Sequence, residues 1–283
     1  MVAISIFNLG LMVKLWRAHR VQAYSHDIPS EKREGKVLVI ASRVFTCVCA
    51  YRAILPRIDV PRVCFFDTFL NWVVFGRLAA TFAEVLWATQ MGLVMRRVAI
   101  RLCENGKMSS PQPFSAAGWA VIAMACIAEC CSWTNLITSS NLFAVFEQSL
   151  WGLLFLIVGI GIAVLLRQWT QRPVTYILFC VLVIGMGLEQ FVEAFDLYLP
   201  RFSSQLENHT HFNGFTEGLT LLAQCNKTTT NMQDWKNDVP WMTGYFSFGV
   251  WSSLWLSVAP LPFSPQSTAS LLDRSASFSY SNN

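Results

Sequence analysis

VVFGRLAATFAEVLWATQMGLVMRR, from Val73 to Arg97, is the stretch of sequence that decides the fold. Arg77 and Glu84 are its only charged residues before the closing pair of arginines, and most of the others are apolar, aromatic or small. About 20 mainly apolar residues are enough to cross a bilayer as a helix. A cation and an anion in such a helix must find partners in a bundle or line a wet cavity. The stretch therefore predicts a membrane-spanning helix that contributes to a polar site.

The composition points to the same class of protein. Hydrophobic residues make up 54% of the 283 residues and charged residues 13%, and the mean hydropathy is +0.43. These values are typical of a multi-pass membrane protein and exclude an ordinary soluble domain. The net charge of +4 is small and its positive charges lie in short loops, so it indicates orientation in a membrane. A nucleic-acid partner is not expected.

Six strong spans and one weaker span are predicted. The strong spans are about 37–55, 68–95, 114–138, 146–166, 174–195 and 241–260. The weaker span, about 2–16, is short and has its positive charges after the apolar stretch, which favours an anchor with its N-terminus outside over a cleaved signal peptide. A truncated first helix is the alternative. The predicted fold class is all-α, a polytopic transmembrane helical bundle over residues 1–260, followed by a disordered, Ser-rich cytoplasmic tail at 261–283.

Two independent signals predict the orientation. Basic residues gather in the loops 17–36, 96–107 and 167–172, which the positive-inside rule makes cytoplasmic. The long loop 196–240 is then lumenal or extracellular, and it holds two glycosylation sequons, at Asn208 and Asn226. The two signals agree. They predict a glycoprotein of the secretory pathway or plasma membrane, with its C-terminus in the cytoplasm.

The charges within the spans suggest two layers. Arg77 and Glu84 are seven residues apart, so they share one face of their helix about 10 Å apart along its axis. We expect Arg43, Arg77, Glu84 and Glu129 to form a buried network near the membrane centre. We also expect an outer acidic cluster of Glu147, Glu189, Glu193 and Asp196, close to Arg52, Arg57 and Arg62. The network either fixes helix packing or provides a path for protons, ions or a small polar solute.

Small residues and aromatic residues accompany these charges. Gly76 and Ala80 make a pair four residues apart on the helix that carries Arg77, which predicts the close approach of a neighbouring helix. Trp87 and Trp133 lie about one turn after Glu84 and Glu129, where they differ from the tryptophans at predicted span ends. The helix 68–95 is therefore expected to be central.

The remaining reactive residues give no sign of catalysis. Six of the nine cysteines lie within predicted spans, whereas Cys64 and Cys225 both fall on the predicted oxidising side, where they can form a disulfide. All four histidines fall in predicted loops, so no metal site within the membrane is expected. No catalytic motif is present. We expect no enzyme activity and no cofactor.

Three classes of function stay open. A transporter- or channel-like protein for protons, ions or a small polar solute is favoured, because acidic residues outnumber arginines within the spans. The alternatives are a seven-helix, receptor-like signalling protein and a non-transporting membrane scaffold or assembly factor. The expected partners are membrane lipids, a small polar solute or ion, and a second copy of the chain.

The predicted topology can be tested by glycosylation mapping. Endoglycosidase treatment should increase the electrophoretic mobility of the protein, and the shift should disappear when Asn208 and Asn226 are both replaced by Gln. A tag placed after Asn283 should be reached by antibody only in permeabilised cells. A protein without a mobility shift, or a tag that is stained on intact cells, would contradict the topology.

Overall fold

The fold is mostly helical. The computed structural model describes residues 2–22, 29–60, 62–169, 173–236, 238–259 and 261. Five of its helices are long and apolar enough to cross a membrane, which indicates an integral membrane protein. They are α2 (Pro29–Ile54), α3 (Val73–Glu104), α4 (Gln112–Thr138), α5 (Asn141–Gln168) and α6 (Val174–Val192), the last continuing through η2 (Glu193–Tyr198) into α7 (Leu199–Glu207).

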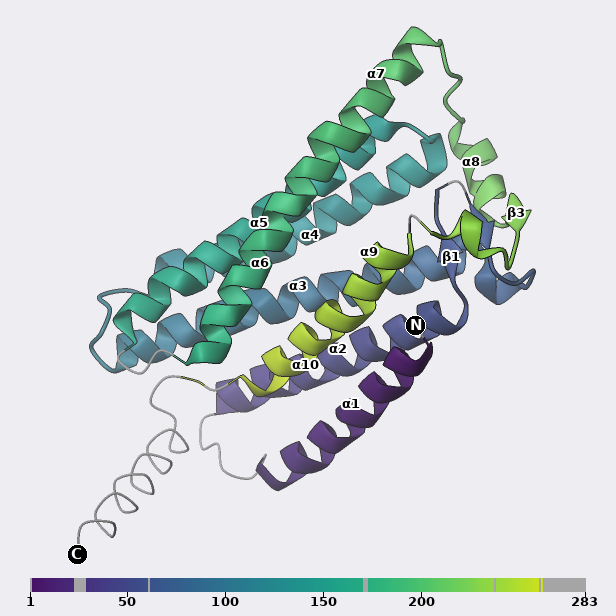
Figure 1. Cartoon of the computed structure of the whole chain (residues 1–283). Coiled ribbons are helices and arrows are strands. Elements are labelled where there is room, and N and C mark those ends of the chain that lie inside the picture. The colour runs from purple at the N-terminus through teal and green to yellow at the C-terminus, as the bar shows by residue number, and fades with distance from the viewer. Residues whose placement is uncertain are drawn as a thin grey trace, which may run out of the picture.

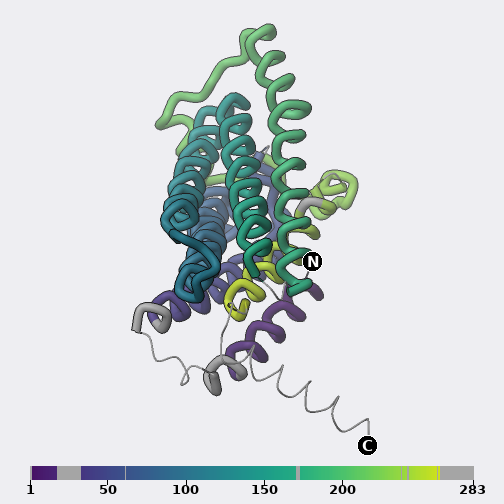
Figure 2. The backbone as a smooth tube through the Cα atoms, turned by 90° about the vertical axis from the view of Figure 1, so that its left-hand side faces the viewer, coloured from purple at the N-terminus to yellow at the C-terminus, as the bar shows by residue number. Residues whose placement is uncertain are grey.

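Helices that follow one another along the chain lie side by side and run in opposite directions (Figures 1 and 2). Short connections between α3, α4, α5 and α6 allow no other arrangement of neighbours. The consecutive segments α9 (Val239–Gly244), η4 (Tyr245–Gly249) and α10 (Val250–Val258) pack against α2 and α3. Helix α1 (Val2–Gln22) covers α2 and α10 at one edge of the bundle.

The predicted spans match helices, and several of these helices extend beyond the predicted span ends. Helix α2 begins at Pro29 and α3 ends at Glu104, so much of the predicted loops 17–36 and 96–107 is helical. The first part of the predicted loop 196–240 is also helical, as far as Glu207. Hydropathy marks the part of a helix that lies in hydrocarbon, whereas backbone hydrogen bonding continues into water. The spans 241–260 and 2–16 correspond to α9–α10 and α1, neither of which is among the five long apolar helices. The predicted tail, beyond residue 261, lies outside the described residues.

Helix α3 is the most deeply buried of the five. In its most apolar stretch 61% of the residues are buried, against 28% in α4 and in α6. Gly92 and Gly118 let α3 and α4 cross closely, since a Cβ added at Gly92 would lie 2.5 Å from the Gly118 carbonyl oxygen. Methionine and aliphatic side chains, such as Met91, Met95 and Leu154, fill the surrounding core. The expected central position of this helix is therefore seen.

A small cap covers the end of the bundle where α3 begins, which we call the cap end; the opposite end, where α10 finishes, is the tail end (Figure 1). The cap contains β1 (Arg57–Ile58) paired antiparallel with β2 (Val63–Cys64), which pairs parallel with β3 (Lys227–Thr228). A disulfide joins Cys64 to Cys225, with the two Cα atoms 5.9 Å apart. The cap thereby ties together two segments that are distant in the sequence.

Gly76 provides the seat for the cap on α3. A Cβ added at Gly76 would lie 1.2 Å from the Arg57 Nη2 atom, so the guanidinium fills the notch that glycine leaves. A neighbouring helix was expected at this position, and an arginine from the cap occupies it instead. Burial lowers the pKa of Arg57, and the adjacent Asp59 carboxylate, 3.4 Å from its Nε atom, opposes that shift.

Gly76→Ala should lower the free energy of unfolding by about 1–3 kcal/mol, because Arg57 must leave the notch and break its contact with Asp59. Gly185→Ala is the matched control, since no atom lies within 4 Å of a Cβ added there. That variant should be neutral or stabilising by about 0.5–1 kcal/mol through helix propensity. Thermal unfolding of the purified proteins in detergent measures both. Equal melting temperatures for the two variants would contradict the proposed packing of Arg57 against Gly76.

Candidate functional site: a buried Arg/Glu network

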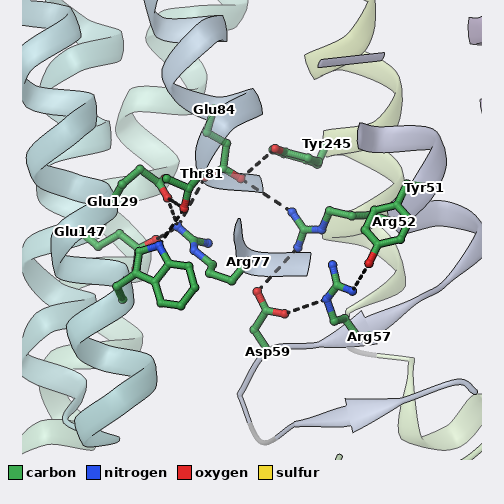
Figure 3. A network of polar contacts seen from close by, with 11 residues as sticks. Tyr51, Arg52, Arg57, Asp59, Arg77, Thr81, Glu84, Glu129, Glu147 and Tyr245 are labelled. Carbon is green, nitrogen blue, oxygen red and sulfur yellow. Dashed lines mark hydrogen bonds and ion pairs between the residues drawn. The ribbon is translucent and has the colours of Figure 1, made fainter. Parts of the chain in front are cut away.

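Arg77 is the centre of a buried polar network (Figure 3). It lies one turn into α3, and its Nη2 atom is 2.8 Å from Glu129 Oε2 on α4. The same atom lies 3.4 Å from Glu147 Oε1 on α5 and 3.5 Å from Glu84 Oε2 on α3. Three carboxyl groups from three helices thus converge on one guanidinium group.

A second set of contacts fixes the position of Glu129. Thr81, one turn after Arg77, donates a hydrogen bond of 2.6 Å to Glu129 Oε2. The indole Nε1 of Trp133 donates in turn to Thr81 Oγ1 at 3.0 Å. Because the hydroxyl accepts one bond and donates the other, its direction is determined. Trp133 therefore acts as a hydrogen-bonding part of the site.

The network continues from Glu84 towards the cap. Glu84 Oε1 accepts a hydrogen bond of 2.8 Å from the hydroxyl of Tyr245 and lies 3.7 Å from Arg52 Nη1. Arg52 also lies 3.8 Å from Asp59. Asp59 in turn pairs with Arg57, the arginine seated at Gly76. A continuous series of charged groups therefore leads from the cap into the bundle (Figure 3).

The charges of this network do not balance. It contains three guanidinium groups, from Arg52, Arg57 and Arg77, and four carboxyl groups, from Asp59, Glu84, Glu129 and Glu147. The Glu129 side chain is only 3% exposed, and its Oε1 atom has no hydrogen-bond partner in the described part of the chain. An uncompensated buried carboxylate is costly. The arrangement is therefore suited to hold one extra proton or cation.

Arg43 was expected in this network and is not part of it. It makes no ion pair with Glu84 or Glu129, and its guanidinium lies 5.1 Å from the centre of the Trp16 ring on α1. Arg52 takes the expected place. The two arginines are nine residues apart on α2, which is two and a half turns, so they project from opposite faces of the helix.

The outer acidic cluster was also predicted only in part. Glu193 lies within electrostatic range of Glu189 and Glu147, but Glu147 itself belongs to the Arg77 network. Glu189 accepts a hydrogen bond from Gln190, and Asp196 is exposed. The arginines expected beside this cluster lie elsewhere: Arg52 and Arg57 share Asp59, and Arg62 donates to the Leu136 carbonyl at 3.4 Å.

Sequence reasoning missed two members of the site. Asp59 was not singled out, although it is the one acid in a segment that carries Arg52, Arg57 and Arg62. Tyr245 was not singled out, although a phenol within an apolar span needs a hydrogen-bond partner when it is buried. Both signals were present in the sequence.

The other predicted positions lie at the cap end. Asn208 ends α7 and Asn226 follows the disulfide cysteine Cys225, and both asparagines are exposed. No group of three or more His, Cys, Asp or Glu side chains suited to a metal occurs among the described residues. Comparisons with models of known protein families, with curated proteins and with solved structures gave no match. The interpretation of the site therefore depends on its own geometry.

Replacing Arg77 with Gln should lower the free energy of unfolding by about 3–5 kcal/mol, because three buried carboxyl groups lose their shared cation. The double variant Arg77→Gln/Glu129→Gln should recover part of that loss, since one of these acids is then neutral. Thermal unfolding in detergent gives the coupling between the two positions. An unchanged melting temperature for Arg77→Gln would show that the network does not stabilise the bundle.

Proposed function

We propose that this chain is a transporter- or channel-like membrane protein whose buried network takes up and releases protons. The observation that carries the proposal is the excess of one carboxyl group over the guanidinium groups, at a site where Glu129 Oε1 lacks a donor. A proton on Glu129 would remove the excess charge and give this oxygen a hydrogen to donate. Carboxyl groups within membrane segments are the usual components of proton relays.

The geometry favours a proton over a metal cation or a larger solute. The guanidinium of Arg77 already occupies the point where Glu84, Glu129 and Glu147 converge, so a metal ion there would meet a fixed positive charge. Protonation of Glu84 or Glu129 requires no room for a further ion. Because both carboxyl groups contact the same Arg77 nitrogen, their titrations are coupled.

Polar groups lead away from the site in both directions. Towards the cap, Glu84 connects through Arg52 to Asp59. Towards the tail end, Trp87 donates to Ser252 at 3.1 Å, and Gln90 exchanges hydrogen bonds with Ser253. Glu84, Trp87 and Gln90 follow one another at three-residue intervals, so each lies about one turn beyond the last. The contacts of Trp87 and Gln90 join α3 to α10, but an indole N–H only donates, so this line of groups is not itself a proton relay.

The proposal includes the expected topology. Helix α1, the five long helices and the α9–α10 segment would make six strong spans and a short seventh, with the cap end lumenal or extracellular and the C-terminus cytoplasmic. The disulfide at the cap is consistent with an oxidising compartment. Asn208 and Asn226 would carry glycans. We propose no enzyme activity and no cofactor, with membrane lipids and a second copy of the chain as partners.

Two other functions each have one observation in their favour. Among the described residues, α1 to α5, the continuous α6–η2–α7 helix and the α9–η4–α10 segment make seven helical segments. Helix α1 starts at the cap end and α10 finishes at the tail end, which favours a receptor-like signalling protein. The contact of Arg77 with acids from three helices favours a scaffold in which the charges only fix packing. Neither alternative requires a proton to enter the network.

Proteoliposomes test the proposal. The wild-type protein should take up protons under an imposed pH gradient, and Glu129→Gln should reduce the rate at least about tenfold while it keeps the melting temperature, because the amide is nearly isosteric and uncharged. Glu189→Gln, which removes an exposed acid on α6, is the matched control and should transport like the wild type. Folded wild-type protein without proton uptake, or full uptake by Glu129→Gln, would reject the proton path.

A further inference from the structure

Arg43 lies within an apolar helix, and its charge is not part of the Arg77 network. Its guanidinium lies against the Trp16 ring, and no ion pair to an acid is found for it among the described residues. The cost of an unpaired arginine at membrane depth is several kcal/mol unless it reaches water or an anion. The position of this side chain therefore calls for water or an anion beside the guanidinium.

The direction of the side chain brings Arg43 close to the boundary of the membrane. Helix α2 begins at the tail end, and Arg43 lies seven residues beyond Lys36, about 10 Å along the axis. Helical side chains tilt towards the N-terminus of their helix, so a long side chain at Arg43 leans back towards the tail end. Trp16, beside it, lies in the last part of α1, where tryptophan marks the level of lipid headgroups.

A small cavity of about 10 Å³ lies beside Arg43. It lies between α1, α2 and α10, and Trp16, Ser42 and Arg43 are among the residues that line it. This volume admits about one water molecule or one oxygen atom of a ligand. Trp16 is 37% exposed at the outer side of this cavity. An acyl chain does not fit inside, whereas an anionic oxygen can reach the guanidinium from the lipid side.

Further positive charges lie at the same end of the bundle. Lys14 and Arg17 on α1 are exposed at the same end of the bundle, as are Arg33 and Lys36 on α2. The nearby acid Glu34 faces α3, where it lies 3.7 Å from Arg96 and 3.9 Å from Arg97. Lys36 lies seven residues before Arg43 and so shares its face of α2, which adds positive charge on that face among the described residues.

We propose that Arg43 binds the phosphate of an anionic phospholipid in the leaflet at the tail end. The planar guanidinium matches two phosphate oxygens and forms charge-assisted hydrogen bonds with them. One oxygen enters the cavity beside Ser42, and the acyl chains stay in the bilayer along α1 and α2. The lipid supplies the counter-charge that Arg43 lacks in the protein. This site is separate from the proposed proton path and does not depend on it.

Lipid retention by the purified full-length protein tests the inference. After exchange into detergent with phosphatidic acid or phosphatidylcholine, native mass spectrometry should show preferential retention of phosphatidic acid. Arg43→Gln should reduce that retention by at least about tenfold, the factor expected for even one of the two charge-assisted hydrogen bonds. Arg201→Gln is the matched control, because Arg201 also lies over an aromatic ring, that of Tyr198 at 5.8 Å, but at the cap end. Its lipid retention should equal that of the wild type.

Several outcomes would overturn the site. Equal retention of the two lipids by the wild type would show that the protein does not prefer an anionic phospholipid, and full retention of phosphatidic acid by Arg43→Gln would show that Arg43 does not bind the headgroup. Displacement of phosphatidic acid by millimolar inorganic phosphate would assign the site to free phosphate instead. Should Arg43→Gln fail to fold, Arg43→Lys decides: it keeps the charge but loses the bidentate fork, so retention should fall about threefold. Unchanged retention in that variant would also reject the inference.

Discussion

The Arg77 guanidinium, shared among Glu84, Glu129 and Glu147, is the interaction on which the bundle depends. Apolar side chains of helices in lipid gain little from burial against one another, because the surrounding hydrocarbon is equally apolar. Many rotations and vertical shifts of α3, α4 and α5 therefore have similar packing energies. A buried cation that must meet acids on two neighbouring helices allows only one of these rotations and shifts. The charges thus specify the arrangement that the apolar residues then fill.

The same network makes the cap and the bundle interior one electrostatic unit. Arg57 fits into the notch at Gly76, Asp59 joins it to Arg52, and Arg52 reaches Glu84. A displacement of the cap would separate Asp59 from Arg52 and move Arg57 out of its notch, at a cost set by burial. The disulfide between Cys64 and Cys225 keeps the cap segments together, so it supports the interior charges from a distance.

Part of this arrangement was accessible from the sequence. Periodicity and the cost of charge in lipid predicted that α3 is a central helix and that Arg77, Glu84 and Glu129 belong together. The choice of Arg43 over Arg52 was wrong because hydropathy gives the depth of a residue and not the face of the helix that meets a partner. Glu147 was assigned to the outside because it opens a predicted span, yet its side chain turns inward to Arg77. Asp59 was missed, although it is the one acid among three arginines, because the sequence does not show that its loop folds back over a helix end.

Helix α3 has two polar sides with different chemistry. Towards α4 and α5 it presents Arg77 and Thr81, whose partners are carboxyl groups. Towards α2 and α10 it presents Trp87 and Gln90, whose partners are hydroxyl and carbonyl groups. Glu84 belongs to both sides, since one of its oxygens faces Arg77 and the other faces Tyr245 and Arg52. A change in the charge of Glu84 would therefore act on both sets of contacts at once. Under the proposed function, protonation of Glu84 would therefore act on its contact with Arg77 and on its contacts with Arg52 and Tyr245.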